Sequence, residues 1–247
     1  MNEDFLWRSE MACRAAWPAE TEIGLGGWSA RRSGGTIRRV NSLNPLPGAT
    51  ELAEATIDRT GDFYAGYGQP ALVRLLSFAG TASADPLARR GYRLEGKTTT
   101  LCADLRNRAP VGGSETKVWD IPDPEWLAAR DRIAVSDPAI FANMLELIRA
   151  PKRFAGVEVD GEIRSIAYAV IVDRLLVLES VATDESCRGR GLARQAVGSL
   201  LHWAVAQGID QAVLQVVTDN APARALYRSL RFETVLFDYF YMRQPQS

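Results

Sequence analysis

The residues best suited to chemistry stand in one glycine-rich turn. Residues 176–192 read LVLESVATDESCRGRGL, an apolar run that passes through a polar turn into Arg188, Gly189, Arg190 and Gly191. A helical pattern follows at once. A helix start presents backbone N–H groups without intrahelical partners, together with the positive end of the helix dipole. Because glycines let an anion approach these groups and arginines add charge, the turn predicts a phosphate-binding site.

Several kinds of turn could explain this stretch. A P-loop needs Lys followed by Ser or Thr, which is absent, and a dinucleotide fingerprint needs Gly or Ala where Arg194 stands. The pattern R-x-x-G-x-A, from Arg188 through Gly191 to Ala193, resembles the coenzyme A loop of the GNAT N-acetyltransferases. The alternative is an ordinary strand-to-helix turn whose arginines serve solubility.

A second motif strengthens the resemblance. Residues 220–232 read NAPARALYRSLRF and look like the family's N-x-x-A-x-x-L-Y-x-x-x-G-F, except that Arg231 replaces the usual glycine. Between Arg153 and Met242 the patterns predict three strands, the glycine loop, a helix, a strand, a helix and a strand, which is the GNAT core order. The resemblance implies an α/β (α+β) fold, the GNAT acyl-CoA N-acyltransferase fold, with a mixed, mostly antiparallel sheet flanked by helices.

The resemblance also assigns a donor site for acetyl-CoA. The loop would hold the pyrophosphate, mainly through backbone amides, and the strand before it would pair its backbone with the pantetheine arm. Asn220 would contact the pantetheine or serve only as a helix N-cap. The predicted coenzyme-binding residues are Val181, Ala182, Thr183, Arg188, Gly189, Arg190, Gly191, Leu192, Ala193 and Asn220.

Two residues are the predicted catalytic pair. Tyr227 matches the family's general acid, and a phenol of pKa about 10 can protonate a thiolate of pKa about 8.5; the alternative is a tyrosine packed at a helix end. Glu179 is the candidate base, since an alkylamine is only about one part in a thousand neutral at physiological pH. Glu179 lies in an apolar strand and shares a face with Val181 by alternation, and its alternative role is a structural ion pair. Gln215 stands where ribosomal-protein N-terminal acetyltransferases carry glutamate, and an amide cannot be a base.

Composition narrows the remaining chemistry. The chain has 247 residues and a formal net charge of −1, so nothing in its charge favours nucleic acid or membrane as a partner. Three unclustered cysteines and the single histidine, His202, argue against a disulfide framework, a metal site and a Ser-His-Asp triad, and they favour the cytoplasm. Cys187 has no histidine beside it in the sequence and is not predicted to be a nucleophile. The resemblance implies a sequential mechanism, with direct attack by the amine and no covalent enzyme intermediate.

The chain is predicted to form two related lobes. The linker candidate RAPVGGSET, residues 108–116, separates a degenerate GNAT-like N-terminal lobe, 1–110, from a GNAT N-acetyltransferase domain, 115–247. Residues 87–94 echo residues 227–234, which indicates tandem GNAT-like lobes. The first lobe lacks the R-x-x-G-x-A loop and should lack a coenzyme site.

The predicted function is transfer of the acetyl group of acetyl-CoA to a primary amine of a small molecule or peptide. A module that binds acyl-CoA or an amino acid without catalysis, and an enzyme that uses a longer acyl-CoA, are the alternatives, and a homodimer is left open. A hairpin is predicted over residues 28–40 around Gly34 and Gly35. Its arginines Arg38 and Arg39 would favour an anionic amine if they faced the cleft between the lobes.

Overall fold

One eleven-stranded sheet organises the part of the chain that the computed structural model describes, residues 2–106, 116–134 and 137–245. The helices are α1 (Glu3–Ala16), α2 (Glu54–Ala65), α3 (Ala84–Arg89), α4 (Pro124–Ile133), α5 (Pro138–Leu147), α6 (Leu192–Ala206) and α7 (Ala221–Ser229), with short 3-10 turns η1 (Arg38–Val40), η2 (Thr81–Ser83) and η3 (Glu185–Cys187). The strands are β1 (Thr21–Leu25), β2 (Trp28–Arg32), β3 (Ser42–Pro45), β4 (Leu72–Leu76), β5 (Arg93–Asp104), β6 (Thr116–Trp119), β7 (Lys152–Val159), β8 (Glu162–Val172), β9 (Leu175–Thr183), β10 (Gln211–Val217) and β11 (Thr234–Arg243). The element order expected between Arg153 and Met242 is confirmed.

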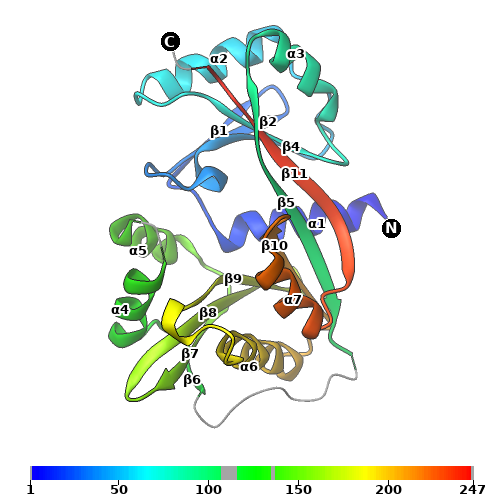
Figure 1. Cartoon of the computed structure of the whole chain (residues 1–247). Helices are drawn as coiled ribbons and strands as arrows, with labels where there is room; N and C mark the ends of the chain where they lie inside the picture. Colours follow the sequence, from blue (N-terminus) through cyan, green and yellow to red (C-terminus); the bar gives the residue numbers. More distant parts are fainter. Residues whose placement is uncertain (1, 107–115, 135–136, 246–247) are drawn as a thin grey trace.

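The two halves of the chain exchange their last strands. The sheet order is β1-β2-β3-β4-β11-β5-β10-β9-β8-β7-β6. Strand β5 pairs antiparallel with β10 of the second half, while β11 lies between β4 and β5. Figure 1 shows β5 and β11 running side by side from one part of the molecule into the other. The lobes 1–110 and 115–247 stay a prediction, since their boundary lies outside the described residues, but each contributes a strand to the other's part of the sheet.

Helices cover both faces of the sheet around its second half. Helix α6 packs on one face through a stripe of apolar residues spaced three or four apart, including Val197, Leu200 and Leu201. Helices α1 and α4 pack on the opposite face of β8 and β9. The two faces therefore have separate apolar cores, and the sheet is mixed and flanked by helices, as predicted.

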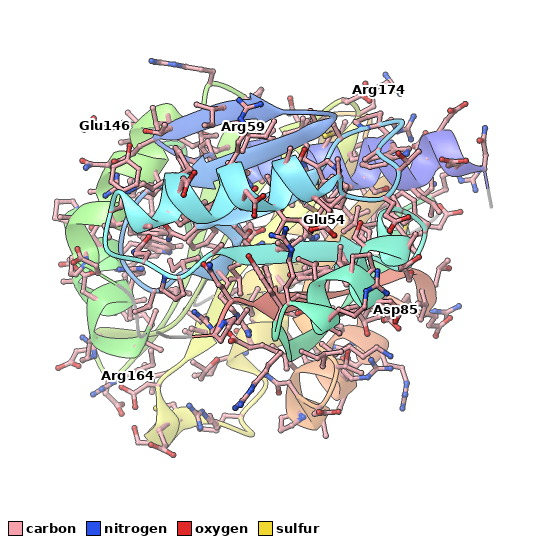
Figure 2. The ribbon with its side chains drawn as sticks, turned by 90° about the horizontal axis from the view of Figure 1, so that it is seen from above. Glu54, Arg59, Asp85, Glu146, Arg164 and Arg174 are labelled. Atoms are coloured by element: carbon pink, nitrogen blue, oxygen red, sulfur yellow. The ribbon has the colours of Figure 1, made fainter. Side chains whose placement is uncertain are left out.

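Charged side chains follow two patterns. Most project outward, and Figure 2 shows Arg59 on α2 and Glu146 on α5 at the periphery. Glu10 and Arg14 are exceptions, because they lie on the buried stripe of α1 beside Trp7 and Trp17. Burial of these charges requires ionic partners from the sheet.

The predicted hairpin over residues 28–40 is correct in its first strand and wrong in its second. A tight hairpin joins β1 to β2 through Gly26 and Gly27, which have φ of 56° and 83°, and the chain then turns back after β2 around Gly34 and Gly35. Strand β2 pairs on its other side with β3, and residues 38–40 form the turn η1. The returning strand was expected before Val40, but it begins only at Ser42, because pairing across the sheet decides where a strand begins and the turn signal alone does not.

Candidate active site

Strands β9 and β10 separate toward their C-terminal ends. They pair in parallel only where Leu176–Leu178 faces Ala212–Leu214. Beyond that, Ser180 has φ of 48° and forms a β-bulge, with two residues of β9 opposite one of β8. A bulge bends its strand and increases the local twist. As a result, no strand in the described part of the chain pairs with the edge of Val181–Thr183 that faces β10.

The glycine turn forms the start of α6. Gly189 and Gly191 have φ of 77° and 78°, a conformation that glycine adopts without strain. Gly191 is the N-cap of α6, and no side chain caps the helix. A Cβ at either glycine would meet no atom within 4 Å. The turn therefore leaves open space beside backbone N–H groups that have no intrahelical acceptor, which suits an anion.

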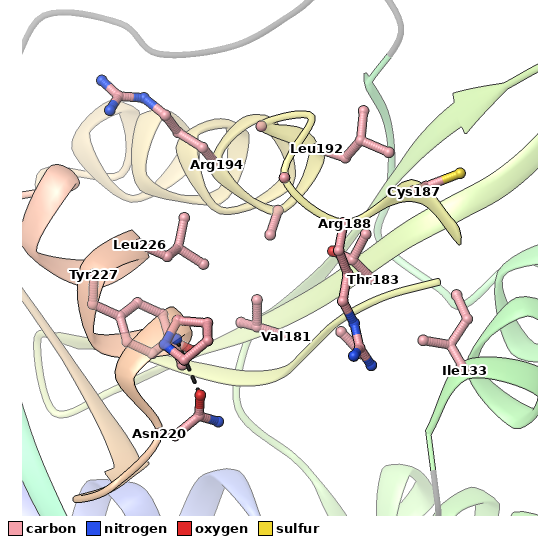
Figure 3. A pocket seen from close by; sticks show the side chains of 16 residues that line it. Ile133, Val181, Thr183, Cys187, Arg188, Leu192, Arg194, Asn220, Leu226 and Tyr227 are labelled. Atoms are coloured by element: carbon pink, nitrogen blue, oxygen red, sulfur yellow. Dashed lines mark hydrogen bonds between the residues drawn. The ribbon is translucent and has the colours of Figure 1, made fainter. Parts of the chain in front are cut away.

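A cavity of about 590 Å³ lies where α6, α7 and the end of β9 meet (Figure 3). It is lined by every predicted coenzyme-binding residue except Arg190, whose guanidinium lies 3.8 Å from the Sγ atom of Cys187. Asn220 caps α7, since its Oδ1 atom accepts a hydrogen bond of 3.1 Å from the backbone N–H of Ala223. The structure thus brings nine of the ten residues to one space, and their binding of coenzyme A stays a prediction.

Tyr227 lines the same cavity. Figure 3 shows its ring directed from α7 toward the space beside β9. The side chain is 7% exposed and packs edge-on against Phe232, with ring centroids 6.0 Å apart. Burial raises the pKa of Tyr227 above its ordinary value, and the negative charge of Glu179 raises it further. The hydroxyl therefore stays protonated near neutral pH and can act as a proton donor.

Glu179 forms a bidentate ion pair with Arg39. The two Nη atoms of Arg39 donate to the two carboxylate oxygens over 2.7 and 2.8 Å. Glu179 is 5% exposed and does not line the cavity. The bulge also interrupts the alternation of β9, so Val181 packs with the core under α6 and does not share a face with Glu179, contrary to the sequence interpretation. The ion-pair alternative is present, and the role of Glu179 as a base stays a prediction.

Gln215 joins this ion pair to a second one. Its Oε1 atom accepts hydrogen bonds from Tyr239 (3.1 Å) and Arg39 (3.4 Å), and its Nε2 atom donates to Glu10 (3.5 Å). Glu10 in turn binds Arg74 of β4. Burial would raise the pKa of Glu10, but its arginine partners lower it to about 2. Sequence reasoning missed Glu10, although a glutamate on the apolar stripe of a helix is a signal that could have found it.

Two solved structures share the fold of this chain. A GCN5-related N-acetyltransferase from Kribbella flavida matches with a TM-score of 0.71 over 97% of this chain and 96% of that one, at 17% identity. A tandem GNAT protein from the clavulanic acid biosynthesis pathway matches with a TM-score of 0.63 over 100% of this chain and 97% of that one, at 12% identity. The chain thus has the GNAT fold.

Sequence relatives agree with the fold. A Bacillus subtilis (strain 168) protein, described as "Uncharacterized N-acetyltransferase YobR", is 23% identical over 242 residues, which cover 94% of this chain and 96% of the relative. The chain is therefore a GNAT-type N-acetyltransferase. The model of the family described as "Probable histone acetyltransferase Rv0428c C-terminal" matches residues 7–236, and the chain belongs to that family. Within the described residues there is no cluster of His, Cys, Asp and Glu that could hold a metal ion, and none of the helices described could span a membrane.

Proposed function

We propose that the chain transfers the acetyl group of acetyl-CoA to a primary amine of a small molecule or peptide by direct attack. The observation that carries this proposal is the cavity, which gathers the anion-binding turn, the unpaired edge of β9 and Tyr227 around one space. These are the parts that a thioester donor and its leaving thiolate need.

The residues present fit the donor. The first N–H groups of α6, with the charges of Arg188 and Arg190, suit a pyrophosphate. The edge of Val181–Thr183 offers backbone groups to the amides of a pantetheine arm, in the manner of an added strand. Asn220 keeps an amide group beside the cavity while it caps α7. Arg190 does not line the cavity, so its part in the proposal is limited to its charge.

The reaction then needs two proton movements. The thioester supplies an electrophilic carbonyl carbon, and the amine forms the new C–N bond as the C–S bond breaks. Glu179 takes a proton from the ammonium group, directly or through water, so that the amine, whose neutral form costs roughly 4 kcal/mol at physiological pH, can attack. Tyr227 gives its proton to the leaving sulfur and is restored by the proton that the acylated nitrogen loses. One proton is released to solvent for each amide formed.

The proposal includes a cytoplasmic location. Cys13, Cys102 and Cys187 are buried free thiols. Unpaired cysteines of this kind suit a reducing compartment.

Thermal unfolding with and without acetyl-CoA tests the donor site. Acetyl-CoA at 100 times its Kd should add about 2.7 kcal/mol of stability, or roughly 5–10 °C for a chain of this size. Gly191→Asp should abolish this shift, because the new side chain brings negative charge into the anion-binding turn. Gly208→Asp is the matched control, since Gly208 also has positive φ and open space around it but does not line the cavity. Loss of the shift in both variants, or in neither, would contradict the proposed donor site.

A further inference from the structure

Glu179 belongs to a network of charged side chains between the two halves of the chain, all of them buried except Glu22 and Arg39. Arg39 binds Glu179, Arg74 binds Glu10, and Gln215 contacts both pairs. Four guanidinium groups in this network stand against three carboxylates, which leaves one positive charge in excess. The charged members are Arg14, Arg31, Arg39, Arg74, Glu10, Glu22 and Glu179. An excess of positive charge in a largely buried network favours binding of an anion.

Within this network, Arg39 is the arginine whose side chain is most exposed. Its side chain is 23% exposed, whereas those of Arg14, Arg31 and Arg74 are 6% exposed or less. The guanidinium of Arg39 lies 4.8 Å from the ring centroid of Trp17, which restricts its orientation. Burial lowers the pKa of Arg39, but the charge of Glu179 outweighs this and holds it well above the ordinary value. An anion that enters from solvent would therefore meet a fixed and permanent cation at Arg39.

Arg39 is connected to the cavity through Glu179 and β9. Its partner Glu179 precedes the bulge at Ser180, and Val181 on the other side of the bulge lines the cavity. The charge of Glu179 acts on the hydroxyl of Tyr227. A substrate whose amine lies between Glu179 and the thioester would therefore have its neighbouring atoms beside Arg39.

We propose that the acceptor is a zwitterionic amine, meaning an amino acid or a small amino-acid derivative with a free carboxylate near its amine. This inference rests on the proposed function and names its substrate class. The acceptor carboxylate would bind Arg39 and its ammonium group would bind Glu179, so each member of the existing ion pair gains a partner of opposite charge. Two carboxylate oxygens offer about four lone-pair positions, so Glu179 can accept from the ammonium while Arg39 stays in place. The ammonium proton then passes to Glu179, and the neutral nitrogen attacks as above.

Matched acceptors test this substrate class. Free α-, β- and ω-amino acids are compared with their carboxamides, with saturating acetyl-CoA and release of the coenzyme thiol as the readout. The best free amino acid should exceed its own amide in kcat/KM by at least about 100-fold, since loss of a desolvated charge pair has effects of this order. Arg39→Gln should bring the ratio close to one, mainly by raising KM, and Arg39→Lys should restore part of it. Arg38→Gln is the control, because Arg38 pairs with Glu95 and should leave the ratio unchanged.

The outcomes separate the two proposals. Equal rates for amino acids and amides in the wild-type enzyme would overturn the zwitterion inference and leave the proposed function standing. The zwitterion inference is likewise overturned if acetyl-CoA stabilises the protein but no free amino acid is acetylated. Failure of acetyl-CoA to stabilise the protein would instead remove the proposed function, and the inference with it. The wild-type comparison distinguishes these outcomes even if Arg39→Gln does not fold.

Discussion

The carboxylate of Glu10 should make the stability of this protein depend on pH in the acidic range. Glu10 is fully buried and binds Arg74 and Arg14. Its pKa lies at about 2 in the folded protein, against 4.5 in an unperturbed glutamate. Because the folded value is the lower one, the unfolded chain binds the proton first as the pH falls. The resulting stability is complete above about pH 4.5 and is lost as the pH falls toward about 2.

The size of the effect follows from the two pKa values. Each pKa unit corresponds to about 1.4 kcal/mol, so the difference between 4.5 and about 2 amounts to ~3 kcal/mol of unfolding free energy. This is a large part of the 5–15 kcal/mol that is typical of folded proteins. The glutamate on α1 therefore contributes a measurable share of the cohesion between the helix and the sheet.

Urea unfolding at a series of pH values measures this contribution. Between about pH 4.5 and pH 2, the unfolding free energy of the wild type should fall by ~3 kcal/mol more than that of Glu10→Gln. Glu146→Gln should follow the wild type, because Glu146 is an exposed residue on α5 (Figure 2). If Glu10→Gln alone does not fold, Arg74→Met is added to it, since removal of both partners costs less than removal of one. Parallel pH profiles for the wild type and the Glu10 variant would refute the reasoning.

Three further changes test other parts of the structure. Tyr227→Phe should lower kcat by roughly 10²–10⁴-fold while acetyl-CoA still raises the melting temperature; an unchanged kcat would remove the acid role. Arg231 has φ of 62°, which is strained for a residue with a Cβ, so Arg231→Gly should raise the unfolding free energy by ~1 kcal/mol in urea titrations. Loss of the surface ion pair with Glu233 should subtract little from this gain. A lower unfolding free energy would contradict this account of backbone strain. Residues 115–247 expressed alone lack β5, which pairs with both β10 and β11. This fragment should therefore not be a monomer in sedimentation that also unfolds cooperatively. A monomer with a cooperative unfolding transition would show that β5 is dispensable for folding of the second half.

Local signals in the sequence predicted much of the second half. Asn220 was expected to cap a helix, and its side chain accepts the capping hydrogen bond. The glycine turn, α6 and α7 were found because their spacing and caps depend on neighbouring residues only. Nine of the ten coenzyme-binding residues that these local patterns predicted line one cavity.

Contacts between distant residues were beyond the reach of sequence patterns. Glu179 was considered as a base or an ion-pair member, and Arg39 as a cation near the substrate, but they are 140 residues apart in the chain. Because of the bulge at Ser180, Val181 points to the opposite face of the sheet from the one that strict alternation predicts. No residue type in the sequence predicts such a bulge. The last strand, β11, was predicted as a strand, yet an apolar pattern does not identify the partner of a strand.

The exchange of strands makes the order of synthesis important. The edge of β5 that β11 occupies is complete at Asp104, but β11 begins only at Thr234, 130 residues later. At 5–20 residues per second, the first half leaves the ribosome roughly 6–26 s before its missing strand exists. During that interval it exposes open strand edges that invite aggregation. A chain that stops before Thr234 keeps those edges permanently, so a late nonsense mutation should lead to degradation of the whole product and not to a stable first half.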